Sequence, residues 1–270
     1  MKRPCQLIYA VGRSRPGNGM KWKSHTAIAR AIAEEMGLPD DLEEELCEGS
    51  VDPDRRPDAA MKVDRMGRTF IGRAPHHDPP AGIIMGHAWR SREAYLRGDD
   101  RQAVRCLGRA LHYIQGKSVS PGLLDRSHDL REEDIADLVP PREAVRKGID
   151  MAVCSPLFVR ECVRAVRPRQ DPREAMYQAT LFSAAIFASV LGPPDSEGRF
   201  ISDYGKARRN RRCRYAAAGM AAASSILISL LLTQPLALIA GAAAVLAAVL
   251  LDHGYYDLRE EAEWFGIRPR

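Results

Sequence analysis

The sequence has no CxxC pair and no closely spaced cysteines, the pattern that would mark a disulfide framework. Its six cysteines are spread over the whole chain, at positions 5, 47, 106, 154, 162 and 213. Small secreted domains concentrate their cysteines in a short sequence instead. Isolated cysteines in apolar helical surroundings behave as small buried hydrophobic residues. The pattern therefore indicates free thiols and a reducing compartment.

The chain also lacks a large excess of one charge and has few aromatic residues. Its formal net charge is +5, and much of this excess belongs to the basic cluster between Lys206 and Arg214. A general nucleic-acid-binding surface would carry a broader basic excess, so we expect no specific nucleic-acid partner. A nuclease would need aromatic side chains for base stacking, and the candidates near the polar motifs are only Trp89, Tyr95 and Tyr113.

No segment shows the sustained period-two alternation of a β-strand, and there is no internal repeat. The apolar spacing instead predicts an all-α fold, a bundle of about seven helices with breaks at Pro and Gly. Helices are expected at 22–36, 40–47, 83–97, 100–115, 128–138, 142–153, 156–166 and 172–192. The expected domains are a flexible tail at 1–19, a metal-binding helical domain at 20–195, a basic linker at 196–214, a transmembrane hairpin at 215–252 and a C-terminal tail at 253–270.

The C-terminal part contains 36 consecutive uncharged residues, from Ala216 to Leu251. One straight helix of that length would measure about 54 Å, whereas the hydrocarbon core of a bilayer is about 30 Å thick. The break at Thr233 to Pro235 divides the run into two halves, which favours a transmembrane helical hairpin. A single tilted span and a hairpin buried in a soluble core are the alternatives. The basic cluster before the run places the soluble domain on the cytoplasmic side and would attract anionic lipid headgroups.

Six of the seven histidines lie between positions 25 and 128, interleaved with acidic residues. Imidazole and carboxylate are ligands that suit zinc and related divalent ions. His128 and Glu132 are four residues apart, so a helix would place both on one face. Further ligands of the right type occur in the irregular connection expected at 50–82, namely Asp52, Asp54, Asp58, His76 and His77. The aspartates also have a simpler interpretation, because Asp-Pro sequences form turns unaided.

Taken in order, these motifs resemble the zinc-dependent phospholipase C and single-strand nuclease superfamily, in particular its intracellular prokaryotic branch. The shared motifs cover roughly residues 20 to 135, and they are Trp22-x2-His25, Glu48 to Asp54, His76-His77, Ala94 to Asp99, Leu107 to Gln115, and His128-x3-Glu132. The resemblance implies an all-α fold whose helices and one long loop hold a zinc cluster for phosphodiester hydrolysis.

Position by position, the resemblance implies that Asp54, His76 and His112 hold one zinc ion, and that His128 with Glu132 holds another. His77 is the alternative to His76, and His25 is expected at the rim of the same cleft. The chain departs from the family where Gly116 and Gly122 occupy positions of an aspartate and a histidine ligand, and where Trp22 is not N-terminal. One to three zinc ions are expected, and a single ion has the strongest support.

We therefore expect a membrane-anchored zinc-dependent phosphodiesterase that hydrolyses the headgroup phosphodiesters of membrane phospholipids with a metal-activated water. Asp54 or Asp52 would orient that water or act as general base, and Arg55, Arg56 or Arg73 would hold the phosphate. The alternatives are a degenerate, non-catalytic membrane protein on the same scaffold, favoured by Gly116 and Gly122, and a nuclease.

Overall fold

A computed structural model describes residues 21–64, 66–75, 78–120, 134–135, 137–193, 197–233 and 235–267. Within these residues the chain is mostly helical, and seven helices form a bundle. They are α1 (Lys21–Met36), α2 (Asp40–Arg55), α3 (Ala81–Leu96), α4 (Asp100–Ser118), α6 (Arg142–Asp150), α7 (Pro156–Ala165) and α8 (Pro172–Leu191). The tail expected at 1–19, and most of the helix expected at 128–138, lie outside the described residues.

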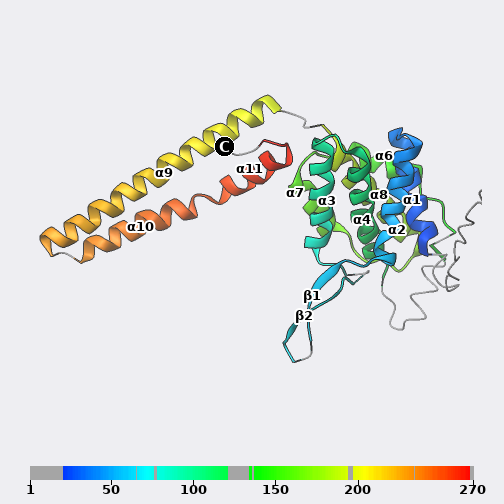
Figure 1. Cartoon of the computed structure of the whole chain (residues 1–270), viewed down its shortest axis with the longest axis horizontal. Helices are drawn as coiled ribbons and strands as arrows, with labels where there is room; N and C mark the ends of the chain where they lie inside the picture. Colours follow the sequence, from blue (N-terminus) through cyan, green and yellow to red (C-terminus); the bar gives the residue numbers. More distant parts are fainter. Residues whose placement is uncertain are drawn as a thin grey trace, which may run out of the picture.

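Helix α4 occupies the middle of the bundle, because it packs against α2, α3 and α8 (Figure 1). Its apolar stripe is buried almost completely and includes Leu107, Leu111 and Ile114. The turn before it is set by Gly98, whose positive φ of 75° favours glycine, and by Asp99, whose side chain accepts a hydrogen bond from the Gln102 amide. The sequence predicted the α3–α4 pair and this turn correctly.

Helix α2 differs from the prediction, because it continues through Glu48 and Gly49 to Arg55. We expected the helix to stop there and an irregular loop to follow from residue 50. Gly49 lies against α4 so closely that a Cβ atom would come within 2.3 Å of the Arg105 carbonyl oxygen. Packing against α4 thus outweighs the helix-breaking tendency of Gly49 and of Pro53, which lies inside the helix.

The connection between α2 and α3 contains a two-stranded antiparallel hairpin that the sequence analysis missed. Strand β1 (Ala59–Val63) pairs with β2 (Thr69–Arg73), so that Met61 lies opposite Ile71. Only Ala60 is buried along these strands, because the hairpin projects away from the bundle (Figure 1). Both faces of the hairpin carry apolar residues, so the two strands show no sustained alternation of apolar and polar residues, which is the usual strand signal.

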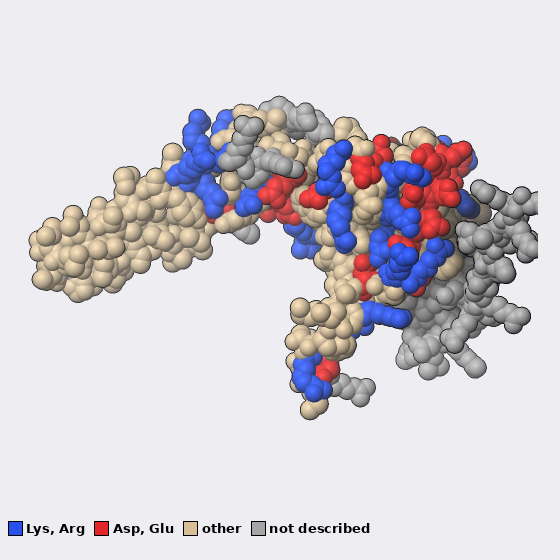
Figure 2. All heavy atoms as spheres, viewed as in Figure 1, with Lys and Arg blue, Asp and Glu red and all other residues tan. Residues whose placement is uncertain are grey.

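The C-terminal part forms a long helical hairpin of α9 (Glu197–Leu232) and α10 (Leu236–Leu250), followed by α11 (His253–Trp264). The segment expected as a basic linker is therefore helical and continuous with the apolar part of α9, and the expected tail contains α11. The turn between α9 and α10 includes Thr233 at a φ of 53° and Pro235. Figure 2 shows that the outer part of the hairpin carries no acidic or basic side chains.

Small residues bring α9 and α10 together, and ion pairs fix the base of the hairpin. A Cβ atom on Gly241 would come within 2.9 Å of the Ser225 side chain, so the two backbones approach closely. At the base, the buried Asp252 accepts hydrogen bonds from Arg211 at 2.7 Å and Arg214 at 2.9 Å. Two of the six cations of the basic cluster thus connect α9 to the end of α10.

Among the residues that the structure describes, three helical stretches are long and apolar enough to cross a membrane, namely α8, residues 200–232 and residues 236–264. Helix α8 is a core helix of the bundle, since 67% of its apolar stretch is buried. The corresponding share is 11% for residues 200–232 and 18% for residues 236–264. An apolar surface of this length exposed on both arms is typical of a segment that lies in lipid.

Helix α11 returns to the bundle and completes its core. Trp264 is fully buried and packs edge to face against Trp89 of α3, with ring centroids 4.8 Å apart. The buried Arg92 donates hydrogen bonds to the carbonyl oxygens of Trp264, Val190 and Gly192. Arg92 therefore binds carbonyl groups from the ends of α8 and α11, where helices leave acceptors unsatisfied.

Candidate metal centre

His112 lies on the buried face of α4, where its ring is held in one orientation. Its side chain is 1% exposed, and its Nδ1 lies 2.8 Å from the Ser50 carbonyl oxygen. A carbonyl can only accept, so Nδ1 carries the hydrogen and Nε2 keeps its lone pair. Burial and the neighbouring His25 lower the pKa of His112 well below its usual value, despite the opposing effect of this hydrogen bond. His112 is therefore neutral at pH 7, the form that binds a metal ion.

Two glycines bring Asp54 to this ring by letting α2 and α4 approach closely. A Cβ atom on Gly108 would come within 2.5 Å of the Leu46 carbonyl oxygen, and Gly49 is equally close to α4 from the other side. This contact places the Ser50 carbonyl at Nδ1 of His112 and the Asp54 carboxylate one turn further along α2. The distance between Asp54 Oδ1 and His112 Nε2 is 3.6 Å.

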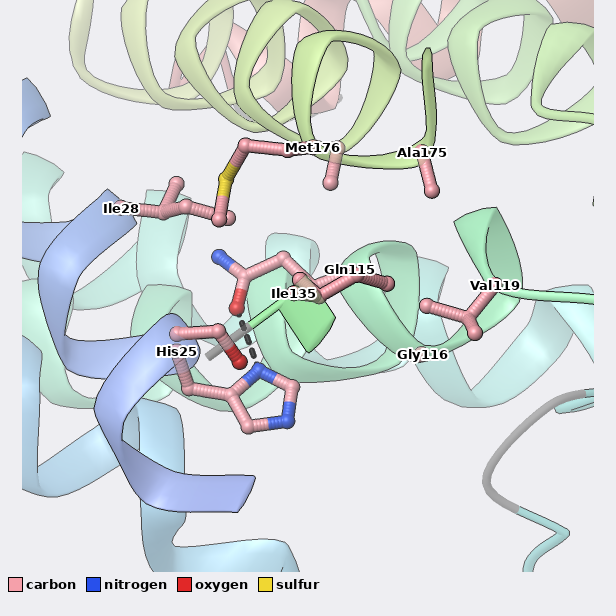
Figure 3. A pocket seen from close by; sticks show the side chains of 10 residues that line it. His25, Ile28, Gln115, Gly116, Val119, Ile135, Ala175 and Met176 are labelled. Atoms are coloured by element: carbon pink, nitrogen blue, oxygen red, sulfur yellow. Dashed lines mark hydrogen bonds between the residues drawn. The ribbon is translucent and has the colours of Figure 1, made fainter. Parts of the chain in front are cut away.

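His25 of α1 completes the group, and its ring is oriented in the same way as that of His112. Its Nδ1 lies 2.5 Å from Oε1 of Gln115, as Figure 3 shows. The amide nitrogen of Gln115 donates in turn to Ser183 Oγ at 3.3 Å, which directs Oε1 toward His25. The His25 Nδ1 therefore donates its hydrogen, and Nε2 keeps the lone pair. The two imidazole rings lie 4.4 Å apart between centroids.

The ligand atoms of His25, Asp54 and His112 all lie within 4.8 Å of one another. Zinc binds nitrogen and oxygen at about 2.0–2.2 Å, so ligand atoms around one ion are separated by roughly 3–4 Å. Metal-binding histidines usually donate their second ring N–H to a carbonyl or carboxylate group, as both histidines do here. The donor set and its supporting hydrogen bonds could therefore hold a metal ion.

A network of ion pairs next to the group contains the other aspartates that the sequence analysis considered as ligands. Arg109 of α4 donates to Asp52 at 2.6 Å and to Asp58 at 2.9 Å. Asp58 also accepts from His87 and Tyr113, each at 2.9 Å. Asp52 and Asp58 thus bind Arg109 and stand outside the His25–Asp54–His112 group.

The environment of Asp58 favours its ionised form. Burial raises the pKa of Asp58, but the hydrogen bonds from His87, Tyr113 and Arg109 lower it more, so that its pKa lies well below the usual range. His87 Nε2 lies 2.9 Å from the Asp58 carboxylate, and its Nδ1 is buried with no hydrogen-bond partner among the described residues.

The remaining predicted positions have different outcomes. His76, His77, His128 and Glu132 lie outside the described residues, so their part in the site stays a prediction. We expected His25 at the rim of the cleft, and the structure places it in the group itself. Gly116 lines a cavity of about 20 Å³ beside His25 and Gln115, which is enough for about one water molecule (Figure 3).

The arginines expected to hold phosphate have other contacts or are exposed. Arg55 pairs with Glu48 at 3.0 Å and lies over the Trp22 ring, and Arg56 and Arg73 are exposed. Gln115, Arg109 and His87 were not recognised as functional residues from the sequence. Arg109, His112 and Gln115 follow one another at intervals of three on α4, and this spacing was the available signal.

No family model, curated protein or solved structure matches this chain. The assignment of a function therefore depends on the chemistry of the site and on the shape of the molecule.

Proposed function

We propose that this protein is a membrane-anchored, zinc-dependent phosphodiesterase that hydrolyses headgroup phosphodiesters of phospholipids. One observation carries the proposal: the buried side chains of His25 and His112 lie with the carboxylate of Asp54 in a group whose ligand atoms are all within 4.8 Å of one another. Each histidine is fixed by a carbonyl acceptor at its Nδ1, from Ser50 or from Gln115. A group of two imidazoles and one carboxylate is a typical ligand set of catalytic zinc sites.

A zinc ion bound here would polarise a phosphoryl oxygen and lower the pKa of its bound water toward about 7. The three side chains differ in their access to solvent, which fixes the direction of approach. His25 and His112 are buried, whereas the side chain of Asp54 is 24% exposed. Water and substrate would therefore approach from the side of Asp54, and its carboxylate is the group placed to orient the attacking water.

Phospholipid is the favoured substrate class because the same chain carries an apolar hairpin of membrane length. The arms 216–232 and 236–250 are about 25 and 22 Å long at 1.5 Å per residue, close to the thickness of a bilayer core. With both arms in the membrane, the site is held beside its substrate, which raises the effective substrate concentration. The basic residues at the base of the hairpin favour a bundle on the cytoplasmic side. A bundle of the phospholipase C type is consistent with the motif order, and it remains part of this proposal.

The test is hydrolysis of phospholipids by the full chain in mixed detergent micelles. Protein stripped of metal by a chelator should be inactive, and added zinc should restore hydrolysis of a choline or an anionic phospholipid. Asp54→Asn should abolish this activity, while Asp137→Asn, at an exposed carboxylate that forms a surface ion pair with Lys23, should retain it. Hydrolysis that is unchanged in the chelated protein or in Asp54→Asn would refute the proposal.

A second function, a structural metal site in a non-catalytic membrane protein, is favoured by the burial of both histidines. The cavity at His25 holds about one water, and Gly116 stands where the resemblance expects a further ligand. A structural site predicts zinc that is retained and needed for thermal stability, without hydrolysis of any phosphodiester. Zinc binding without activity would therefore select this function over the first.

A further inference from the structure

The hairpin β1–β2 exposes a set of large apolar side chains that the proposed site does not use. Cross-strand pairing places Met61 opposite Ile71 and Val63 opposite Thr69, so that these side chains lie on one face. The exposed fractions are 75% for Met61, 79% for Ile71 and 66% for Val63, and Met66 in the turn is 78% exposed. An exposed apolar hairpin of this kind marks an interaction surface or a risk of aggregation.

The hairpin is held firmly at its root. Ala60 is buried, and the Ala74 amide donates to the Asp58 carbonyl oxygen at 2.7 Å. The Asp58 side chain accepts hydrogen bonds from α3 and α4 at the same place. The bundle therefore fixes the direction in which the tip points, and strands of five residues carry it about 17 Å outward.

The position of the tip relative to α9 and α10 indicates what covers it. In Figure 1, β1–β2 projects from the lower end of the bundle and slants toward the side to which α9 and α10 extend, so both hairpins point away from α1. A bilayer that contains the apolar arms would lie on that side of the bundle, so the tip of β1–β2 would face its surface.

The charge of the segment agrees with a lipid surface. Asp64 is the only acidic residue between Ala59 and Arg73, against four cations, Lys62, Arg65, Arg68 and Arg73. Basic residues around exposed apolar side chains bind anionic headgroups while the apolar groups enter the acyl region. A protein partner would also accept the apolar face, but it would not explain why the tip slants toward the side to which α9–α10 extends.

We infer that β1–β2 is a second membrane contact, which inserts Met61, Val63, Met66 and Ile71 into the interface of the bilayer that holds α9–α10. The two contacts together fix the orientation of the bundle on the membrane, since a single hairpin would leave it free to rotate about its own axis. The inference depends on α9–α10 being embedded in lipid, and it holds whether or not the chain hydrolyses phospholipids.

Site-specific photocrosslinking of the full chain in lipid nanodiscs with anionic phospholipid tests this contact. A benzophenone amino acid at Ile71 should form lipid adducts several-fold more often than the same residue at Val139. Val139 is a suitable control because it is 84% exposed and precedes α6, whose Arg142 pairs with Glu34 of α1 at the far end of the bundle. A third label at Leu231, near the end of α9 and 71% exposed, should form lipid adducts and establishes that α9–α10 is embedded.

Adducts to lipid at positions 71 and 231, with few at 139, support the inference. Lipid adducts at 231 alone would overturn it, and so would adducts at 71 that join two copies of the chain. The absence of lipid adducts at 231 would overturn the inference as well, because α9–α10 would then not be embedded in the membrane. None of these outcomes depends on zinc or on hydrolysis, so the result is independent of the proposed activity.

Discussion

At the scale of single residues, Gln115 determines how His25 is presented to the candidate metal site. It accepts the His25 Nδ1 hydrogen and donates to Ser183, so one amide connects α1, α4 and α8. The motif that ends in Gln115 identified His112 as a candidate ligand, but nothing in the sequence indicated a role for Gln115. The reason is spatial, since His25 and Gln115 are 90 residues apart in the chain.

Replacing Gln115 with Met should weaken metal binding by about 10- to 100-fold, because the His25 ring would lose the acceptor that orients it. The affinity for zinc can be measured by competition with a chelating dye. Ser118→Ala is the control on the same helix, as the Ser118 hydroxyl donates only to the Ile114 carbonyl oxygen among the described groups. Equal affinity in Gln115→Met and the wild type would show that His25 is not a ligand.

The second residue-scale prediction concerns Asp58, whose pKa is depressed by its donors. A depressed pKa means that ionised Asp58 stabilises the fold above about pH 4, and that this contribution is lost as the pH falls further. Asp58→Asn should lower the free energy of unfolding by about 1–3 kcal/mol at pH 7. The difference from the wild type should narrow as denaturant titrations are moved below pH 4. A difference that grows on acidification would contradict this account.

At the scale of elements, the sequence predicted helices well where local signals and packing agree, as in α3, α4 and α8. It failed where they conflict. Gly49 and Pro53 were interpreted as the end of a helix, yet tight packing of α2 against α4 keeps them helical. The hairpin β1–β2 was missed because its apolar residues face outward, and α11 because its buried Trp264 gives little sign of amphipathic spacing.

The close approach of α2 and α4 can be tested with Gly108→Ala. The new Cβ atom would lie 2.5 Å from the Leu46 carbonyl oxygen, so the two helices must separate. We expect a loss of about 1–3 kcal/mol in unfolding free energy and weaker zinc binding, since Asp54 moves away from His112. Gly82→Ala on α3 has nothing within 4 Å of the added Cβ and should be neutral or slightly stabilising. Unchanged zinc affinity in Gly108→Ala would show that the close packing of α2 against α4 is not needed for zinc binding.

At the scale of the whole molecule, the bundle and the apolar hairpin are coupled by α11, which the domain boundaries drawn from the sequence did not anticipate. Truncation after Gly205 would free the chain from the membrane, but it would also remove Trp264 from the core. Loss of a buried aromatic side chain costs about 3–5 kcal/mol, and the buried Arg92 would lose one of its carbonyl acceptors.

Replacing residues 216–251 with a short Gly-Ser linker should give a soluble protein that keeps its thermal stability. The linker can be short, because Arg214 and Asp252 are already in contact. Truncation after Gly205 should be soluble too, but with a lower melting temperature. Fractionation without detergent and thermal unfolding would measure both properties. A linker variant that still requires detergent would show that residues 216–251 are not the main membrane contact of the chain.

The candidate site was predicted in part. His112 and Asp54 were expected to meet, and the structure brings them together with His25 in a group that could hold a metal ion. The network that Arg109 and His87 form with Asp58 could not be recognised, because these interactions join α2, α3 and α4 over 29 to 57 residues of sequence. Long-range pairing of this kind depends on how the helices pack, which apolar spacing alone does not specify.

The most direct test of the central claim is the zinc content of the full chain, purified without a histidine tag and dialysed against limiting zinc. The account predicts about one firmly bound ion in the wild type and in His87→Gln, a buried histidine outside the group. His25→Gln, Asp54→Asn and His112→Gln should each lose most of this metal. A wild type that binds no zinc, or triad variants that bind as much as the wild type, would contradict a metal centre at these three residues.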